Sequence, residues 1–264
     1  MKRRDFLSTS AGLGVLSLMH GPARTDAAVA ANQQLLQWIR VRMHVGPKRK
    51  RFTDFVRDAA VPALNRAGIK TVGVFTGKYG PDQSTLFLLL PHDSLESVIT
   101  LSSRLLDDAE FRKSGAGIVD LPISDPAYVR IESSLMLAFK NMPKVEVPAA
   151  FLKTESRIYE VRIYESHSAK AGKKKVEMFN EGGEIAIFRK TGLVPVFFAE
   201  TVIGPMVPNL HYMLVFENME ARDKGWAVFG RDPEWLKLRA DAQYADTVSN
   251  ITDLILSPTA YTQI

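Results

Sequence analysis

The chain contains no cysteine among its 264 residues. Without thiols it can form no disulfide bond, hold no metal through thiolates and use no cysteine nucleophile. Its stability must therefore come from hydrophobic cores or from association with further copies of the chain. The sequence leaves open whether the protein is a homo-oligomer.

Long hydrophobic runs are also missing. The most apolar N-terminal stretch, residues 7–19, is too short to cross a bilayer as a helix, and no longer apolar run follows it. We therefore expect no membrane span.

The first thirty residues have the features of an export signal. Arg3 and Arg4 precede the short apolar run, and the Ala28-Val29-Ala30 tripeptide offers a small-residue cleavage site. We interpret residues 1–30 as a twin-arginine signal peptide, with a basic tail as the alternative. This interpretation predicts a periplasmic or secreted protein.

Neither sign of charge is in large excess. The formal net charge is +5, and it falls to +3 when residues 1–30 are removed. Such a mild positive balance does not favour nucleic acid as a partner. The 46% of hydrophobic and 24% of charged residues are typical of a globular protein.

The sequence contains two copies of one unit. Three landmarks of the first copy recur about 124 residues later in the second: Gly68, Gly80-Pro81 and the segment 108–111 correspond to Gly192, Gly204-Pro205 and the segment 232–235. The alternating segments 39–42 and 161–164 precede these landmarks and align 122 residues apart, so that Arg40 corresponds to Arg162. Two copies at so long a period indicate a duplicated domain.

Each copy is predicted to have the element order β-α-β-β-α-β. The second copy has strand patterns over 159–165, 193–203, 210–217 and 252–257, with helices between them; the first has them over 36–44, 70–77, 86–90 and 128–138. This order is that of a split βαβ unit, an antiparallel sheet with helices on one face. We therefore predict an α+β fold of tandem ferredoxin-like domains, residues 35–140 and 154–264, joined by a linker at 141–153.

A sheet covered by helices on one side has a second face to bury. Here each copy can supply a sheet for the other, and two sheets packed face to face give an α/β barrel. The sequence leaves open whether the barrel closes within one chain or between two chains.

The second copy resembles the NIPSNAP family, a branch of the dimeric α/β-barrel superfamily. Its opening strand, residues 159–164 with the sequence YEVRIY, is similar to the start of that family's pattern. Gly204-Pro205, the strand containing His211 and the DPEW segment at 232–235 follow in the family's order. The resemblance implies the fold and a pair of barrel-forming domains. It implies no single activity, because relatives include small oxygenases, haem-handling enzymes and proteins that only bind.

Alternation in the opening strand of the second copy divides its side chains between two faces. We expect Val161 and Ile163 on one face and Glu160, Arg162 and Tyr164 on the other, with Arg162 on the face away from the helices. A buried arginine needs a partner. The predicted partners are Glu160, Glu200, residues of the first copy or an anionic ligand. Arg40 is assigned the same position in the first copy.

Two histidines complete the candidate ligand-binding set. His44 ends the first strand of its copy, and His211 begins a third strand; near a barrel mouth, strand ends are suitable places for an acid, a base or an axial ligand. The histidine spacings match no metal motif, so no metal site is predicted, and no cofactor is identified. The candidate set is Arg162, Tyr164, Glu160, Arg40, Glu200, His211 and His44.

Three functions are compatible with these patterns. The first is an exported protein that binds a small anionic or aromatic molecule inside the barrel. The second is a small oxygenase, isomerase or haem-dependent enzyme, as the resemblance implies. The third is a non-catalytic assembly or interaction protein with a solid barrel, which dense apolar filling and fully paired arginines would favour.

Overall fold

The computed structural model describes residues 32–264. The predicted signal peptide lies outside the described residues. Within 32–264, no helix has both the length and the hydrophobicity needed to cross a bilayer.

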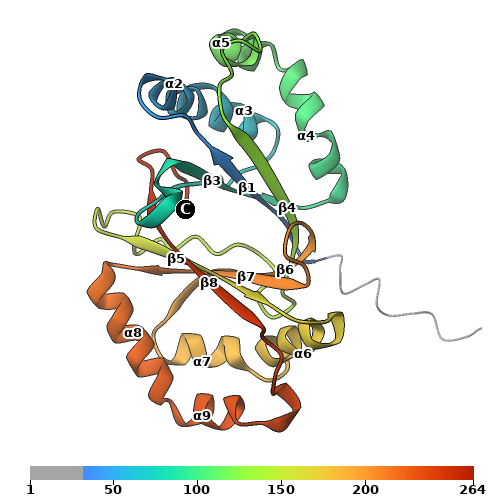
Figure 1. Ribbon diagram of the computed structural model, residues 1–264, viewed down its shortest axis with the longest axis vertical. Coiled ribbons are helices and arrows are strands. Elements are labelled where there is room, and N and C mark those ends of the chain that lie inside the picture. The colour runs from blue at the N-terminus through green and yellow to red at the C-terminus, as the bar shows by residue number, and fades with distance from the viewer. Residues whose placement is uncertain (1–31) are drawn as a thin grey trace, which may run out of the picture. The chain divides into compact units, whose positions relative to one another are not determined.

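Residues 32–264 form one compact unit built from two βαββαβ halves (Figure 1). The first half contains β1 (Leu35–Arg42), α2 (Pro47–Phe55), η1 (Val56–Ala60), α3 (Val61–Arg66), β2 (Gly73–Gly77), η2 (Gly80–Ser84), β3 (Thr85–His92), α4 (Leu95–Asp107), α5 (Ala109–Val119) and β4 (Arg130–Ala138). The second contains β5 (Ile158–Glu165), α6 (Ala169–Asn180), α7 (Glu184–Lys190), β6 (Val194–Ile203), β7 (Asn209–Phe216), α8 (Met219–Arg231), α9 (Pro233–Arg239), η3 (Ala242–Tyr244) and β8 (Asn250–Pro258). The predicted tandem of ferredoxin-like units is confirmed.

Local sequence signals place the helix ends. Asp232 caps α9 by accepting hydrogen bonds from the backbone N–H groups of Glu234 and Trp235, and Pro233 fills the first helical position, where no donor is needed. Asp108 caps α5 in the first half by accepting from Phe111. Gly192 has φ = 83° and ends the helical segment before β6, as glycine can without steric cost.

The eight strands close into one barrel within the chain. Their order around it is β1-β3-β2-β8-β5-β7-β6-β4, and every pair of neighbours is antiparallel. The two halves meet along β2–β8 and along β4–β6, so each last strand pairs with the other half. The barrel therefore closes between the two copies of one chain.

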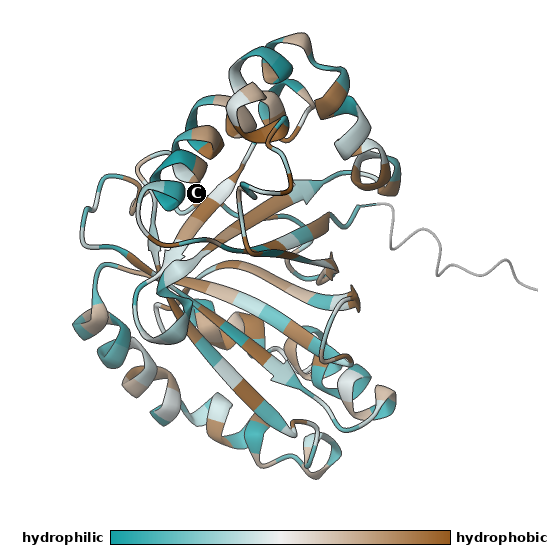
Figure 2. Cartoon of the chain, turned by 45° about the horizontal axis from the view of Figure 1, so that its top comes forward, coloured by the Kyte–Doolittle hydropathy of each residue, from teal (hydrophilic) through white to brown (hydrophobic). Residues whose placement is uncertain are grey.

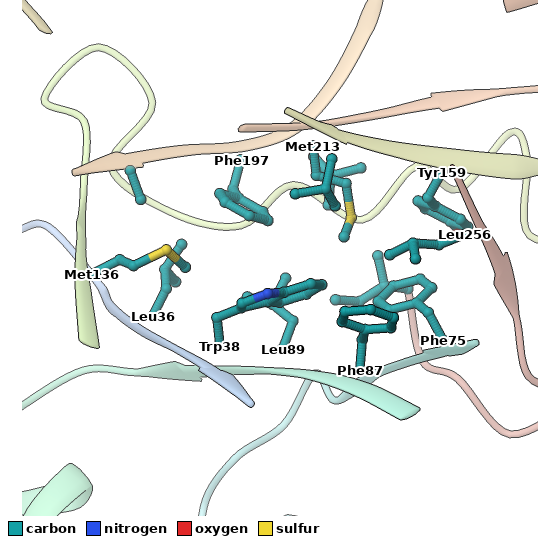
Figure 3. Packing of buried hydrophobic residues seen from close by; sticks show 14 of the residues in the cluster. Leu36, Trp38, Phe75, Phe87, Leu89, Met136, Tyr159, Phe197, Met213 and Leu256 are labelled. Carbon is teal, nitrogen blue, oxygen red and sulfur yellow. The ribbon is translucent and has the colours of Figure 1, made fainter. Parts of the chain in front are cut away.

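Three buried layers follow from this arrangement. Helices α2–α5 cover one side of the barrel and α6–α9 cover the other (Figure 1). Hydrophobic residues recur along the strands between these layers, whereas the helices also carry many hydrophilic residues (Figure 2). The central layer is the barrel interior, where side chains of facing strands meet (Figure 3). Its members include Leu36, Trp38, Phe75, Phe87, Met136, Tyr159, Val161, Phe197, Met213 and Leu256.

The strand register corrects the alignment of the two opening strands. Leu35 begins β1 opposite His92, and Ile158 begins β5 opposite Phe216, so the two strands correspond with a shift of 123 residues. The sequence alignment used 122. Because side chains alternate along a strand, an error of one residue moves every side chain to the opposite face. Arg40 therefore corresponds to Ile163, and the predicted equivalence of Arg40 and Arg162 is wrong.

Leu256 provides a test of the barrel core. It is fully buried on β8, where it pairs with Gly77 of β2 and Tyr159 of β5. Replacing it with alanine should lower the free energy of unfolding by about 2–5 kcal/mol, because the side chain leaves a cavity. Leu106→Ala, at a half-exposed position in α4, is the matched control and should change stability by no more than about 0.5 kcal/mol. Equal losses in urea denaturation would contradict a barrel closed at this seam.

Candidate functional site

The opening strand of the second half faces opposite to the sequence prediction. Val161 and Ile163 lie in the barrel interior, together with Tyr159. Tyr164 packs in the hydrophobic layer between the sheet and α6–α9, and Glu160 binds side chains of α8. Glu160, Arg162 and Tyr164 thus lie on the helix-covered face. The prediction placed them toward the barrel because it expected the apolar residues of the strand to face the helices, whereas the apolar layer inside the barrel takes those residues.

Glu160 is the centre of a polar cluster between β5 and α8. The residue is fully buried, and its carboxylate accepts two hydrogen bonds from Arg222, with N···O distances of 2.7 and 3.0 Å. The indole Nε1 of Trp226 donates a third, at 2.7 Å. This pairing satisfies a charge that would otherwise be too costly to bury.

Arg162 is held by protein groups as well. Its Nε lies 2.5 Å from Asp253 Oδ1 on the neighbouring strand β8, and its guanidinium lies 4.7 Å from the ring centre of Trp226. Glu160 contributes a longer contact of 3.9 Å. The predicted partner Glu200 is exposed on β6 and makes no ion pair with Arg162. Arg162 is therefore part of an internal ion-pair network, which is one of the two roles that the sequence allowed for it.

Deeper in the same layer lie two tyrosines, the half-buried Tyr164 and the buried Tyr212, together with a buried ion pair. The hydroxyls of Tyr164 and Tyr212 lie 3.0 Å apart, and Lys175 Nζ lies 2.9 Å from Glu184 Oε2. Burial raises the pKa of Tyr164 to about 12 and also raises the pKa of the Glu184 carboxyl, against the opposing effect of Lys175. The tyrosines are therefore un-ionised at neutral pH, and the cluster stabilises the packing of helices on the sheet.

The barrel interior has an apolar end and a polar end. The start of β1 lies at the apolar end, where Leu36 is fully buried; two residues of the linker segment, Val145 and Phe151, pack against the interior cluster to which Leu36 belongs. At the other end, which we call the mouth, β1, β2, β5 and β6 finish and β3, β4, β7 and β8 begin. The hairpin loops that contain Gly80-Pro81 and Gly204-Pro205 both lie at the mouth.

His211 is the most deeply buried ionisable group of the mouth. It shares the interior face of β7 with Met213 and Val215, pairs with Ala199 and Ile163, and is only 4% exposed. Its Nδ1 is buried and has no hydrogen-bond partner among residues 32–264. Burial, reinforced by the charge of Arg40, lowers the pKa of His211 to about 4. The imidazole is therefore neutral at pH 7 and presents one nitrogen as an acceptor and one as a donor.

Arg40 lies on the interior face of β1, two residues beyond Trp38. Its guanidinium lies 5.7 Å from the ring centre of Phe87, 3.0 Å from Asp82 in η2 and 3.7 Å from Glu132 on β4. The charge of Arg40 is thus compensated by two carboxylates. Arg40 and His211 are the two predicted candidates that the fold brings together in the barrel.

Trp38 adds a second polar atom without a partner. The side chain is 2% exposed and extends from β1 toward Phe197 on the opposite sheet (Figure 3). Its Nε1–H is buried and has no acceptor in the described part of the chain. An indole donor in this position is unusual, because buried donors are nearly always paired.

His44 lies just beyond β1, two residues after Arg42, at the mouth end of the strand. Its Nε2 is buried without a hydrogen-bond partner in residues 32–264. Within the same residues, no group of three or more histidine and carboxylate side chains is arranged to bind a metal.

Sequence reasoning missed Trp38 in the barrel interior and Asp82 and Glu132 at the mouth. The signal for Trp38 was present, since it alternates with Arg40 in the opening strand. Asp82 comes from a turn and Glu132 from a strand about 90 residues after Arg40, so only the closed sheet brings them to one place.

Comparison with known families identifies the second half. Residues 159–263 match the NIPSNAP family model, as the motifs of this half of the chain predict. A NIPSNAP-like domain protein from Burkholderia xenovorans is 26% identical over 41% of this chain and 90% of its own, with a TM-score of 0.36. No curated protein gives a significant match.

Both halves together resemble barrel proteins of known structure. A protein from Fusobacterium nucleatum named "putative monooxygenase" has a TM-score of 0.58 at 10% identity, covering 88% of this chain and 94% of its own. A protein of the same name from Lactobacillus acidophilus has a TM-score of 0.53 at 10% identity, covering 88% and 97%. At this identity the likeness establishes the α/β-barrel fold alone.

Glu160 provides a test of the polar cluster between β5 and α8. Glu160→Ala should lower the free energy of unfolding by about 3–5 kcal/mol, because Arg222 and Trp226 Nε1 would lose their acceptor in a buried site. The control is Glu220→Ala, which removes an exposed partner of Lys224 and should cost at most about 0.5 kcal/mol. Urea denaturation measures both. A small loss at Glu160 would show that the cluster does not hold α8 on the sheet.

His211 should make stability depend on pH. The unfolded chain protonates this histidine below about pH 6.5, whereas the folded chain does so only near pH 4. Since the unfolded state binds the proton first, the free energy of unfolding should fall by about 3 kcal/mol as the pH drops from 6.5 to 4. His211→Phe should lack this part of the decrease. Parallel curves of unfolding free energy against pH for wild type and variant would contradict the assignment. His92 also has a pKa lowered to about 4, but it is present in both proteins, so its contribution cancels in the comparison.

Proposed function

We propose that the protein binds a small, largely apolar or aromatic molecule at the mouth of the barrel. The observation that carries this proposal is His211, a neutral buried imidazole on the interior face of a barrel lined by hydrophobic and aromatic groups, whose buried Nδ1 has no partner in residues 32–264. Trp38 Nε1 supports it as a second unpaired polar group in the same interior. Apolar walls with a few polar atoms are typical of ligand sites.

The chemistry of these groups favours binding over acid–base catalysis. A histidine with a pKa of about 4 is neutral at pH 7 but is a weak base, so it would accept a hydrogen bond more readily than a proton. A hydroxyl of the ligand suits His211, and a carbonyl or ether oxygen suits Trp38. Enzymatic activity of the oxygenase or isomerase kind stays a prediction that the fold permits.

An assembly or interaction role is the second candidate. Two observations favour it: apolar side chains fill the end of the barrel around Leu36, and both Arg40 and Arg162 are paired with carboxylates. A barrel that is only a solid core would satisfy these observations too. The ligand experiment below separates the two candidates.

Export through the twin-arginine route remains part of the proposal. It rests on Arg3 and Arg4, the short apolar run and the small residues at 28–30. Fractionation of cells that produce the full chain, compared with an Arg3→Lys, Arg4→Lys variant, would test it. Equal amounts outside the cytoplasm for both proteins would refute the assignment.

Calorimetric titration with 2-naphthol tests the proposed site. The wild type should bind this neutral aromatic hydroxyl compound, and His211→Phe should bind it about 10-fold more weakly, because one hydrogen bond to a buried acceptor is lost. His167→Phe is the matched control, since His167 is exposed in the loop after β5 and should leave the affinity unchanged. Failure of the wild type to bind, or equal binding by His211→Phe, would favour the solid-barrel alternative.

A further inference from the structure

Two arginines stand side by side at the mouth of the barrel. Arg42 ends β1 and Arg130 begins β4, and the two residues are directly opposite each other in the antiparallel register. Residues opposite each other in such a pair point to the same face of the sheet. Alternation from Trp38 along β1 and from Met136 along β4 places this face toward the barrel axis. Both arginines are exposed.

This juxtaposition is unfavourable unless something compensates it. Like charges directly opposite each other on neighbouring strands destabilise the sheet. The next interior pair along the same strands shows the usual solution, since Arg40 lies opposite Glu132 and also contacts Asp82. Neither Arg42 nor Arg130 forms an ion pair with a carboxylate of residues 32–264.

The opposite side of the mouth has different chemistry. Glu165 at the end of β5 and Asn250 at the start of β8 occupy the positions that correspond to Arg42 and Arg130, and Asn250 Nδ2 donates to Glu165 Oε1 at 2.8 Å. The outermost interior pair is therefore two arginines beside β1 and β4, whereas beside β5 and β8 it carries one carboxylate and no positive charge. An anionic group entering the barrel is attracted to the first side and repelled by the second.

We infer that Arg42 and Arg130 together bind a carboxylate on the ligand, whose apolar or aromatic body lies in the barrel toward His211 and Trp38. This inference rests on the proposed function and specifies the ligand class as an aromatic or apolar carboxylic acid. Two guanidinium groups on one face offer paired N–H donors that match the two oxygens of a carboxylate. The anion would also remove the repulsion between the two arginines.

Two probes of the same shape separate the charge from the apolar body. We would titrate 2-naphthoate and neutral 2-naphthamide into the wild type by calorimetry at low salt. The carboxylate should bind roughly 10-fold or more tightly than the amide, the effect expected of charged hydrogen bonds. Arg42→Gln and Arg130→Gln should each weaken 2-naphthoate toward the affinity of the amide and leave 2-naphthamide unchanged.

Two further variants control for charge alone. Arg112→Gln removes the same charge from an exposed position on α5 and should change neither affinity. Glu165→Gln removes the acidic group across the mouth and should leave 2-naphthoate binding equal or stronger. Circular dichroism and thermal unfolding confirm that each variant is folded.

The outcomes distinguish this inference from the proposed function. Equal affinity of the wild type for both probes overturns the carboxylate site and leaves binding at the barrel intact. Binding of neither probe overturns both. A loss of 2-naphthoate affinity in Arg112→Gln as large as in Arg42→Gln would show that overall charge, not the arginine pair, attracts the anion.

Discussion

The face-to-face burial of two β-sheets is the constraint on which the rest of this structure depends. A sheet with helices on one side must bury its other side when that side is also apolar, and in this chain each half covers the apolar open face of the other. Pairing of β4 with β6 and of β8 with β2 then closes the sheet of residues 32–264 into a barrel without a free edge. The interior is consequently mostly apolar, and among residues 32–264 the buried His211 Nδ1 and Trp38 Nε1 remain there without hydrogen-bond partners, which is why the proposed ligand site is built on them.

The two halves share one architecture but differ in where their polar side chains lie. The second half carries the NIPSNAP signature, and its polar residues Glu160, Arg162 and Tyr164 fasten the helix layer to the sheet. The polar side chains that reach the barrel mouth come from both halves, with Arg40 from the first and His211 from the second. The part of the chain that keeps the family pattern is thus not by itself the part that builds the candidate site.

Charge is distributed in this protein according to burial. The buried ionic groups Glu160, Lys175 and Glu184 are paired with protein groups, as low polarity requires. His211 instead loses its proton, because a neutral imidazole can be buried at less cost than a charged one. At the exposed mouth, the like charges Arg42 and Arg130 lie opposite each other on neighbouring strands.

The sequence by itself determined the duplication, the βαββαβ order, the NIPSNAP resemblance and the caps such as Asp232, because these depend on local spacing and on residues close together in the chain. It did not determine the register between the copies. The separate expectation that the apolar residues of β5 face the helices placed Arg162 instead of Val161 toward the barrel, since both faces of this strand carry buried residues and polarity does not tell which one meets the helices. The contacts of Arg40 with Asp82 and Glu132, and its proximity to His211, required the closed barrel, because they join strands and a turn that are distant in sequence.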